Sequence, residues 1–215
     1  MQSNTTTREN YDRLSRWYDL ISGRAEKKLV YATLEILSPK KDETVLEIGP
    51  GTGHALVSLA QAVEPAGRVY GLDISPGMLQ VARQRVQRAG LAAMVHLIRG
   101  NGTHLPFVVK QFDAILMSFT LELFDETEIP SVLAGCWRAL KLGGHLGVVS
   151  LSRQGGSNWM VWAYEWLHSK YPSLVDCRPI LVSKSLEVSG FYVETNQHRS
   201  LWGLPVEVAI AKRME

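Results

Sequence analysis

Residues 45–56 read VLEIGPGTGHAL, and this stretch decides the fold. An apolar run of the kind that forms a buried strand enters a turn with glycines at positions 49, 51 and 53, and a helical pattern follows. Because glycine lacks a Cβ atom, the backbone can turn sharply here and come close to a ligand. The first turn of the following helix presents free backbone N–H groups. The stretch therefore predicts a strand, a ligand-binding loop and a helix.

Short apolar runs and helical stretches alternate along the chain, which predicts an α/β fold with a mainly parallel sheet. Strands are expected over residues 44–49, 68–73, 94–99, 112–119, 145–151, 191–195 and 206–211. Helices are expected over residues 52–63, 75–89, 126–140 and 182–188, and two more over residues 7–37, broken near position 22. Residues 141–144, KLGG, are expected to form a turn into the fifth strand.

The composition fits one globular domain. The chain has 215 residues, of which 46% are hydrophobic and 20% charged, so it can bury a single large core. Two cysteines, Cys136 and Cys177, rule out a disulfide scaffold and a cysteine-built zinc site. The first ten residues are polar, and no apolar run is long enough to span a bilayer. We therefore expect a cytoplasmic protein.

Metal and nucleic-acid chemistry find little support in the sequence. The six histidines are scattered and no pair has the helical spacing of a zinc site, so no metal is expected. The formal net charge is only +2. Arg83, Arg85 and Arg88 fall on one expected helix and are interpreted as its solvated face. No nucleic-acid partner is expected.

The glycine spacing separates two ligand classes. A dinucleotide-binding loop has the pattern G-x-G-x-x-G, whose third glycine would stand where this chain has His54. The glycines instead follow G-x-G-x-G. Asp73 ends the second expected strand, where a carboxylate can accept hydrogen bonds from both hydroxyls of a ribose. Its alternative role is to cap the next helix, for which Ser75 is also well placed.

Four further blocks follow the first in a recognisable order. They are VYGLDISPGML, RGNGTHLPF at residues 99–107, FDAILMSFTLELF and WRALKLGGHLGVVS. Over residues 43–151 the chain resembles the class I S-adenosylmethionine-dependent methyltransferases, and GNGTHLPF is most similar to the menaquinone and ubiquinone methyltransferases. The N-terminal helix and the C-terminal segment resemble those of quinone and phospholipid methyltransferases. The resemblance implies a Rossmann-like seven-stranded sheet in the order 3-2-1-4-5-7-6, with the last strand antiparallel and helices on both faces.

The resemblance also implies a site for S-adenosylmethionine, whose product is S-adenosylhomocysteine. Glu47 and the glycine loop are expected to hold the methionine end, Asp73 the ribose and Asn101 the adenine amino group. The residues expected to bind this cofactor are Tyr18, Glu47, Gly49, Gly51, Thr52, Gly53, Asp73, Ile74, Met78, Asn101, Gly102 and Ser118. Gly102 stands where alanine is usual, which is interpreted as a neutral difference. Three alternatives stay open: Glu47 as the partner of a backbone turn, Asn101 as a turn former and Met78 as a core residue.

The expected acceptor is small and apolar or lipid-like, because the likeness extends to quinone and phospholipid methyltransferases. Tyr18, on an amphipathic N-terminal helix, and Glu122, just past the fourth strand, are candidate bases if the acceptor must lose a proton. Trp159 and Trp162 are candidate substrate contacts, with a membrane-surface patch, a dimer contact and core packing as alternatives. Arg178 binds an anionic group or forms a surface salt bridge.

One domain over residues 1–215 is expected, built from four parts. They are an N-terminal helical cap over 1–42, a cofactor-binding core over 43–151, a helical insert or lid over 152–180, and a helix with a strand pair over 181–215. Basic residues beside the aromatic ones of the N-terminal helix suggest weak peripheral contact with a membrane. A non-catalytic S-adenosylmethionine-binding module and a nicotinamide-dependent oxidoreductase are the alternative functions.

Overall fold

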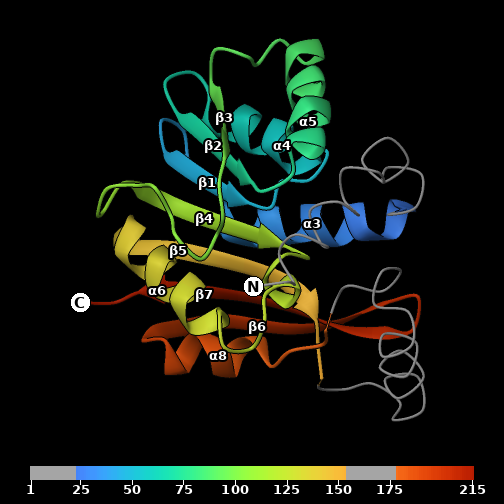
Figure 1. The fold of residues 1–215 in the computed structure, drawn as a ribbon, viewed down its shortest axis with the longest axis vertical. Helices are drawn as coiled ribbons and strands as arrows, with labels where there is room; N and C mark the ends of the chain where they lie inside the picture. The colour runs from blue at the N-terminus through green and yellow to red at the C-terminus, as the bar shows by residue number, and fades with distance from the viewer. Residues whose placement is uncertain (1–22, 154–177) are drawn as a thin grey trace.

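One seven-stranded sheet organises the computed structural model, which describes residues 23–153 and 178–215 (Figure 1). Its strand order is β3-β2-β1-β4-β5-β7-β6, as the sequence predicts. The strands are β1 (Thr44–Ile48), β2 (Arg68–Asp73), β3 (Val95–Arg99), β4 (Phe112–Ser118), β5 (Leu140–Leu151), β6 (Phe191–Leu201) and β7 (Leu204–Arg213). β1 to β5 run parallel, whereas β7 is antiparallel to both of its neighbours, β5 and β6.

Helices cover both faces of this sheet. The described helices are α3 (Gly23–Leu37), α4 (His54–Val63), α5 (Pro76–Arg88), α6 (Ile129–Ala139) and α8 (Val182–Val188), with a short 3-10 helix η1 (Leu121–Leu123). α3, α4 and α5 share one apolar cluster with Val45 of β1. α6 and α8 share another with Leu46 and Ile48. Alternate residues of β1 thus point to opposite faces, so Glu47 lies on the face that α3 and α4 cover.

The order of the strands creates a position for a ligand. β1 lies inside the sheet, with β2 on one side and β4 on the other. The chain therefore changes direction across the sheet between β1 and β4, and open α/β sheets bind ligands at the carboxyl ends of the strands beside such a reversal. The glycine loop begins at that point, directly after β1.

Two elements differ from the sequence-based expectation. Residues 141–144 do not form a separate turn, because β5 already begins at Leu140. The expected turn is instead an irregularity within the strand pair β4–β5, whose register shifts between Phe112 and Ala114, and Gly143 has φ +74°. β6 and β7 extend well beyond the expected strands into a long hairpin around Trp202 and Gly203, which both have positive φ.

A buried carboxylate holds the last helix beside the end of β5. Glu207 of β7 accepts hydrogen bonds from the backbone N–H groups of Val182 (3.2 Å) and Ser183 (2.9 Å), at the start of α8. It also accepts bonds from the hydroxyls of Ser152 and Ser183. A carboxylate at a helix start satisfies N–H groups that have no partner within the helix, so Glu207 fixes α8 relative to the sheet.

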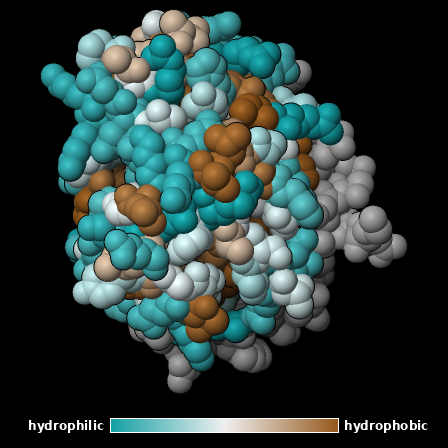
Figure 2. Space-filling view, turned by 90° about the vertical axis from the view of Figure 1, so that its left-hand side faces the viewer, coloured by the Kyte–Doolittle hydropathy of each residue, from teal (hydrophilic) through white to brown (hydrophobic). Residues whose placement is uncertain are grey.

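The surface carries no large apolar area on the face that Figure 2 shows, where hydrophilic side chains surround small separate hydrophobic patches. Exposed large hydrophobic residues include Tyr31, Val109, Val188 and Trp202. Among the described residues, no helix has the length and apolar character needed to cross a membrane.

Candidate active site

A cleft runs across the carboxyl ends of β1, β2 and β4 and consists of two adjoining hollows. The β2-side hollow has an empty volume of about 760 Å³ and is lined by Ile48, Gly49, Gly51, Leu72, Asp73, Ile74, Met78, Gly100, Asn101, Gly102, Ser118, Phe119, Thr120, Leu123 and Phe124. The α3-side hollow has an empty volume of about 550 Å³ and is lined by Lys27, Val30, Tyr31, Glu47, Gly49, Pro50, Gly51, Thr52, His54, Ala55, Ser118 and Phe119. Both volumes include space that is open to solvent.

The glycine loop forms the floor between the two hollows. A Cβ atom on Gly49 would lie 2.4 Å from Oγ1 of Thr120, so a side chain here collides with the turn after β4. Gly51 has φ +52° and nothing within 4 Å of such a Cβ position, so it faces the open cleft. The first glycine is thus required by packing, whereas the second leaves room for a ligand to approach the backbone.

Asp73 connects this loop to the next helix. Its Oδ2 atom accepts a hydrogen bond from the Gly51 N–H (3.2 Å) and its Oδ1 atom accepts one from the Ser75 N–H (2.9 Å). The side chain that caps α5 is Ser75, whose hydroxyl oxygen accepts the Met78 N–H at 3.1 Å. Asp73 also lines the β2-side hollow, as expected for a group that binds a ribose.

Glu47 is a buried acid at the other end of the cleft. Its side chain is only 1% exposed, lines the α3-side hollow, and has an Oε2 atom without a hydrogen-bond partner among the described residues. Burial, and secondarily the negative charge of Asp73, raise its pKa from 4.5 to about 8. The free protein therefore holds Glu47 mostly protonated at pH 7, and a cation entering this hollow would favour its charged form.

Some residues that were expected to contact the adenine also have structural roles. Ile74, Met78 and Asn101 all line the β2-side hollow, and Met78 is also buried in the core. The Oδ1 atom of Asn101 accepts the Thr103 N–H at 3.0 Å, so the residue forms a turn as well as lining the hollow. A Cβ on Gly102 would lie 2.8 Å from Cζ of Phe124. An alanine at this position would therefore require the Phe124 ring to shift, and the interpretation of a neutral difference stays a prediction.

Two expected residues lie away from the cleft. The Glu122 carboxylate is buried and accepts the Leu151 N–H at 3.3 Å, and it is not among the described residues that line either hollow. This hydrogen bond links η1 to the end of β5, and the role of Glu122 as a base stays a prediction. Arg178 is exposed, with Nη1 3.8 Å from Oδ1 of Asp125, which fits the surface salt bridge rather than an anion site. Tyr18, Trp159 and Trp162 lie outside the described residues.

Sequence reasoning missed several contributors. Arg85 is not part of a solvated face, because it is half-buried and donates a hydrogen bond to the Thr52 carbonyl of the glycine loop. Phe119, Thr120 and Phe124 line the cleft from the turn after β4. The stretch FDAILMSFTLELF contains all three, but nothing in its apolar pattern separates cleft residues from core residues. Within the described segments, no group of three or more histidine, cysteine or acidic residues is placed to hold a metal ion.

Known proteins resemble this chain in sequence and in fold. Residues 45–144 match a family described as "Methyltransferase domain". Demethylmenaquinone methyltransferase from Geobacillus sp. (strain WCH70) is 34% identical over 145 residues, 67% of this chain and 59% of that protein. The enzyme of the same name from Lactiplantibacillus plantarum is 34% identical over 149 residues, 69% and 60% of the two chains. The chain therefore matches about 60% of the length of these relatives.

Solved structures extend the likeness in fold to most of the chain. A SAM-dependent methyltransferase from Aquifex aeolicus superposes with a TM-score of 0.68 at 21% identity, covering 92% of this chain and 97% of that one. Geranyl diphosphate C-methyltransferase from Streptomyces coelicolor A3(2) gives a TM-score of 0.71 at 14% identity, covering 88% and 81%.

The sheet order, the glycine loop and the acid that ends β2 define a nucleoside-binding α/β protein of the Rossmann-like type. The family match over residues 45–144 and the relatives above 30% identity narrow this class of protein further. The chain belongs to the class I S-adenosylmethionine-dependent methyltransferases.

The glycine loop predicts opposite outcomes for two neighbouring substitutions. Gly51→Val should leave the protein folded, with a loss of about 1–2 kcal/mol for the left-handed backbone, but should abolish S-adenosylmethionine binding because the side chain enters the cleft. Gly49→Ala should lower the free energy of unfolding by more, since its Cβ overlaps Thr120. Chemical denaturation and titration calorimetry measure both effects. Full binding by folded Gly51→Val would show that the ligand does not contact the loop.

The raised pKa of Glu47 predicts a pH-dependent stability. Between about pH 4.5 and 8 the folded protein keeps a proton that the unfolded chain releases. The free energy of unfolding should therefore fall as pH rises through this range and level off above it, by on the order of a few kcal/mol. Glu47→Gln cannot ionise and should lack this component, so it should gain relative stability at pH 8.5. Identical pH profiles from chemical denaturation of the two proteins would contradict the assignment.

Proposed function

We propose that this protein transfers a methyl group from S-adenosylmethionine to a quinone-type acceptor. The observation that carries the proposal is the distribution of acids in the cleft. Asp73 lines one hollow and the buried, incompletely hydrogen-bonded Glu47 lines the other. The adenosine half of S-adenosylmethionine carries a ribose with two hydroxyls and its methionine half carries an ammonium group, so both acids meet groups that they can bind.

The residues of the two hollows fit this donor in character as well as in position. Asp73 lines the hollow and its carboxylate is a charged acceptor, so it suits the hydroxyls of a ribose. Ile74 and Met78 offer apolar surface for the adenine ring in the same hollow. Glu47, charged when a cation is near, accepts hydrogen bonds from the ammonium group.

Catalysis then rests mainly on positioning. The bound donor supplies an electrophilic methyl group on a positively charged sulfur, and its transfer to a nucleophilic atom leaves a neutral thioether. The glycine loop, Asp73 and Glu47 hold the donor at both ends, which restricts it to orientations that suit an in-line displacement. We assign no base role to Glu122 in this proposal, because its carboxylate accepts the Leu151 N–H.

The acceptor class is supported by the relatives. Both named relatives are demethylmenaquinone methyltransferases, which favours a quinone ring with an apolar tail over a phospholipid head group. Such an acceptor resides in a membrane, so we propose reversible contact with the membrane surface. Tyr18, Trp159 and Trp162 remain proposed contacts over the donor and the acceptor.

Labelled methyl transfer tests the proposal. The protein is incubated with methyl-labelled S-adenosylmethionine and phospholipid vesicles, with or without demethylmenaquinone reduced to its quinol, whose ring carbon can attack the methyl group and then lose a proton, and the products are separated. We expect label in the quinone and none in the phospholipid. Label in phospholipid alone would mean that the acceptor is a phospholipid and not a quinone. Tighter binding of NAD than of S-adenosylmethionine would overturn the methyltransferase proposal.

Asp73→Ala is the informative variant for the same assay. It should weaken S-adenosylmethionine binding at least tenfold, since charge-assisted hydrogen bonds to the ribose contribute about 1.5–3 kcal/mol each. Asp113→Ala is the matched control, because it removes an aspartate that pairs with Lys141 at the amino end of β4, away from the cleft. Equal affinity in Asp73→Ala and the control would contradict the ribose assignment.

A further inference from the structure

The two hollows of the cleft meet at four residues, Gly49, Gly51, Ser118 and Phe119, which line both of them. Two of these are glycines, so within residues 23–153 and 178–215 the side chains at the junction come from Ser118 and Phe119. In the proposed donor, the sulfur links the methionine part to the adenosine part. If these parts occupy the α3-side and β2-side hollows, the sulfur lies at the junction.

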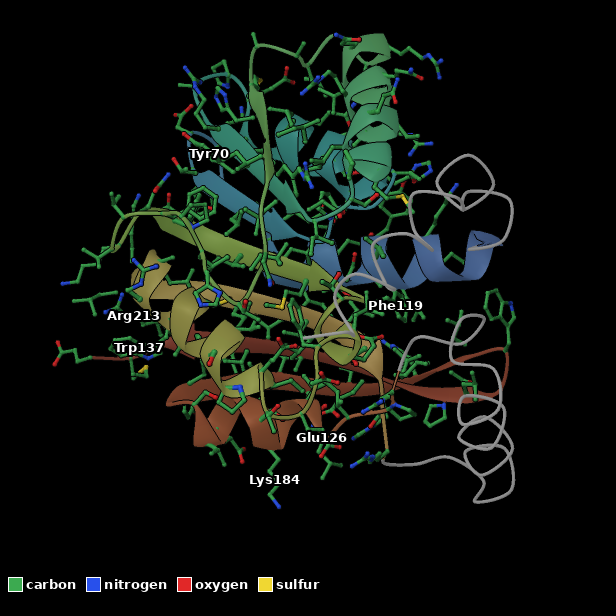
Figure 3. All side chains as sticks on the ribbon, viewed as in Figure 1. Tyr70, Phe119, Glu126, Trp137, Lys184 and Arg213 are labelled. Atoms are coloured by element: carbon green, nitrogen blue, oxygen red, sulfur yellow. The ribbon has the colours of Figure 1, made fainter. Side chains whose placement is uncertain are left out.

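We propose that the Phe119 ring contacts the sulfonium group of the bound donor and makes the site prefer the charged donor over its neutral product. This inference rests on the proposed function, because it requires S-adenosylmethionine to occupy the cleft. Phe119 lies beside the carboxyl end of β4, close to α3 (Figure 3).

The backbone at Phe119 supports a role for its side chain. Phe119 has φ +50°, in the left-handed region that favours glycine. Four other non-glycine residues of the described chain have positive φ, namely Ser38, Asp42, Lys110 and Trp202, and all four are exposed. Phe119 alone in this set is half-buried and lines the cleft. A bulky residue held in a rare conformation at a ligand cleft points to a functional constraint.

Neighbouring contacts hold this conformation in place. The Phe119 N–H donates to the Val149 carbonyl of β5 at 2.8 Å, which continues the strand pairing past the end of β4. The next residue, Thr120, is buried, and its hydroxyl lies 2.9 Å from the Ser118 carbonyl as a donor. The Thr120 side chain also fills the space beside Gly49. The position of Phe119 is therefore set by β5 and by the glycine loop together.

The ring has a fixed apolar support on one side. Phe119 packs against a buried cluster at the ends of β5, β6 and β7, formed by Val149, Leu151, Leu201, Val206 and Val208. Its remaining surface lines both hollows. An aromatic ring attracts a cation through the negative charge of its face and offers nothing comparable to a neutral thioether. Transfer of the methyl group removes this attraction, so the product should leave more readily than the donor.

Binding of the donor and of the product to matched variants tests the inference. Titration calorimetry gives the affinities of S-adenosylmethionine and S-adenosylhomocysteine for the wild type, Phe119→Leu and Phe119→Tyr. Phe119→Leu removes the ring and keeps apolar bulk, so the ratio of donor affinity to product affinity should fall about 3- to 10-fold. Phe119→Tyr keeps the ring and should retain the wild-type ratio.

Phe124→Leu is the matched control. Phe124 also lines the cleft, but only in the β2-side hollow. Its loss should weaken the binding of donor and product by the same factor and leave the ratio unchanged. Thermal denaturation checks that each variant is folded. If Phe119→Leu does not fold, Phe119→Met serves as the ring-free variant.

The outcomes separate the inference from the proposed function. If the wild type binds neither ligand, the proposed function is wrong and the inference falls with it. If the wild type binds both and the ring-free variant keeps the wild-type ratio, Phe119 is a packing residue only and the inference is overturned. A fall in the ratio for the ring-free variant, but not for Phe119→Tyr or Phe124→Leu, supports it.

Discussion

The contact between Gly49 and Thr120 is the constraint on which the cleft depends. It joins the loop after β1 to the turn after β4, the two strand ends between which the chain reverses direction across the sheet. Because no Cβ stands between them, the Thr120 hydroxyl lies 3.4 Å from the Gly49 carbonyl and 2.9 Å from the Ser118 carbonyl. Gly51, Ser118 and Phe119 then come together as the shared boundary of two hollows.

Electrostatics adds a second layer to this geometry. Two acids in one cleft would repel each other if both were charged, and burial with the charge of Asp73 keeps Glu47 mostly protonated in the free protein by raising its pKa to about 8. The backbone N–H groups of Gly51 and Ser75 donate hydrogen bonds to the Asp73 carboxylate and stabilise its negative charge. The site is thus prepared for a ligand with neutral hydroxyl groups near Asp73 and an ammonium group near Glu47, and the proposed donor carries both.

The sequence predicts the frame of this site well and its finer parts poorly. Hydrophobic runs and glycine stops locate β1 to β5 and α8, and the family resemblance supplies the strand order. The hairpin β6–β7 is longer than predicted, because its exposed residues interrupt the apolar pattern. The roles of Arg85 and Phe119 could not be predicted, since one depends on a contact with the distant Thr52 carbonyl and the other on a local φ value. The contact of Glu122 could not be predicted either, because its place in the sequence does not show that its carboxylate accepts the Leu151 N–H.

The central claim is that one ligand occupies both hollows around the glycine loop. Hydrogen–deuterium exchange with and without S-adenosylhomocysteine tests it most directly, because bound ligand slows the exchange of amides that it covers or holds. The account predicts slower exchange in three separate segments, residues 49–53, 99–103 and 118–120, and unchanged exchange at the opposite end of the sheet, around residues 141–145. Unchanged exchange in all three segments at saturating ligand, or protection confined to another surface, would contradict the account.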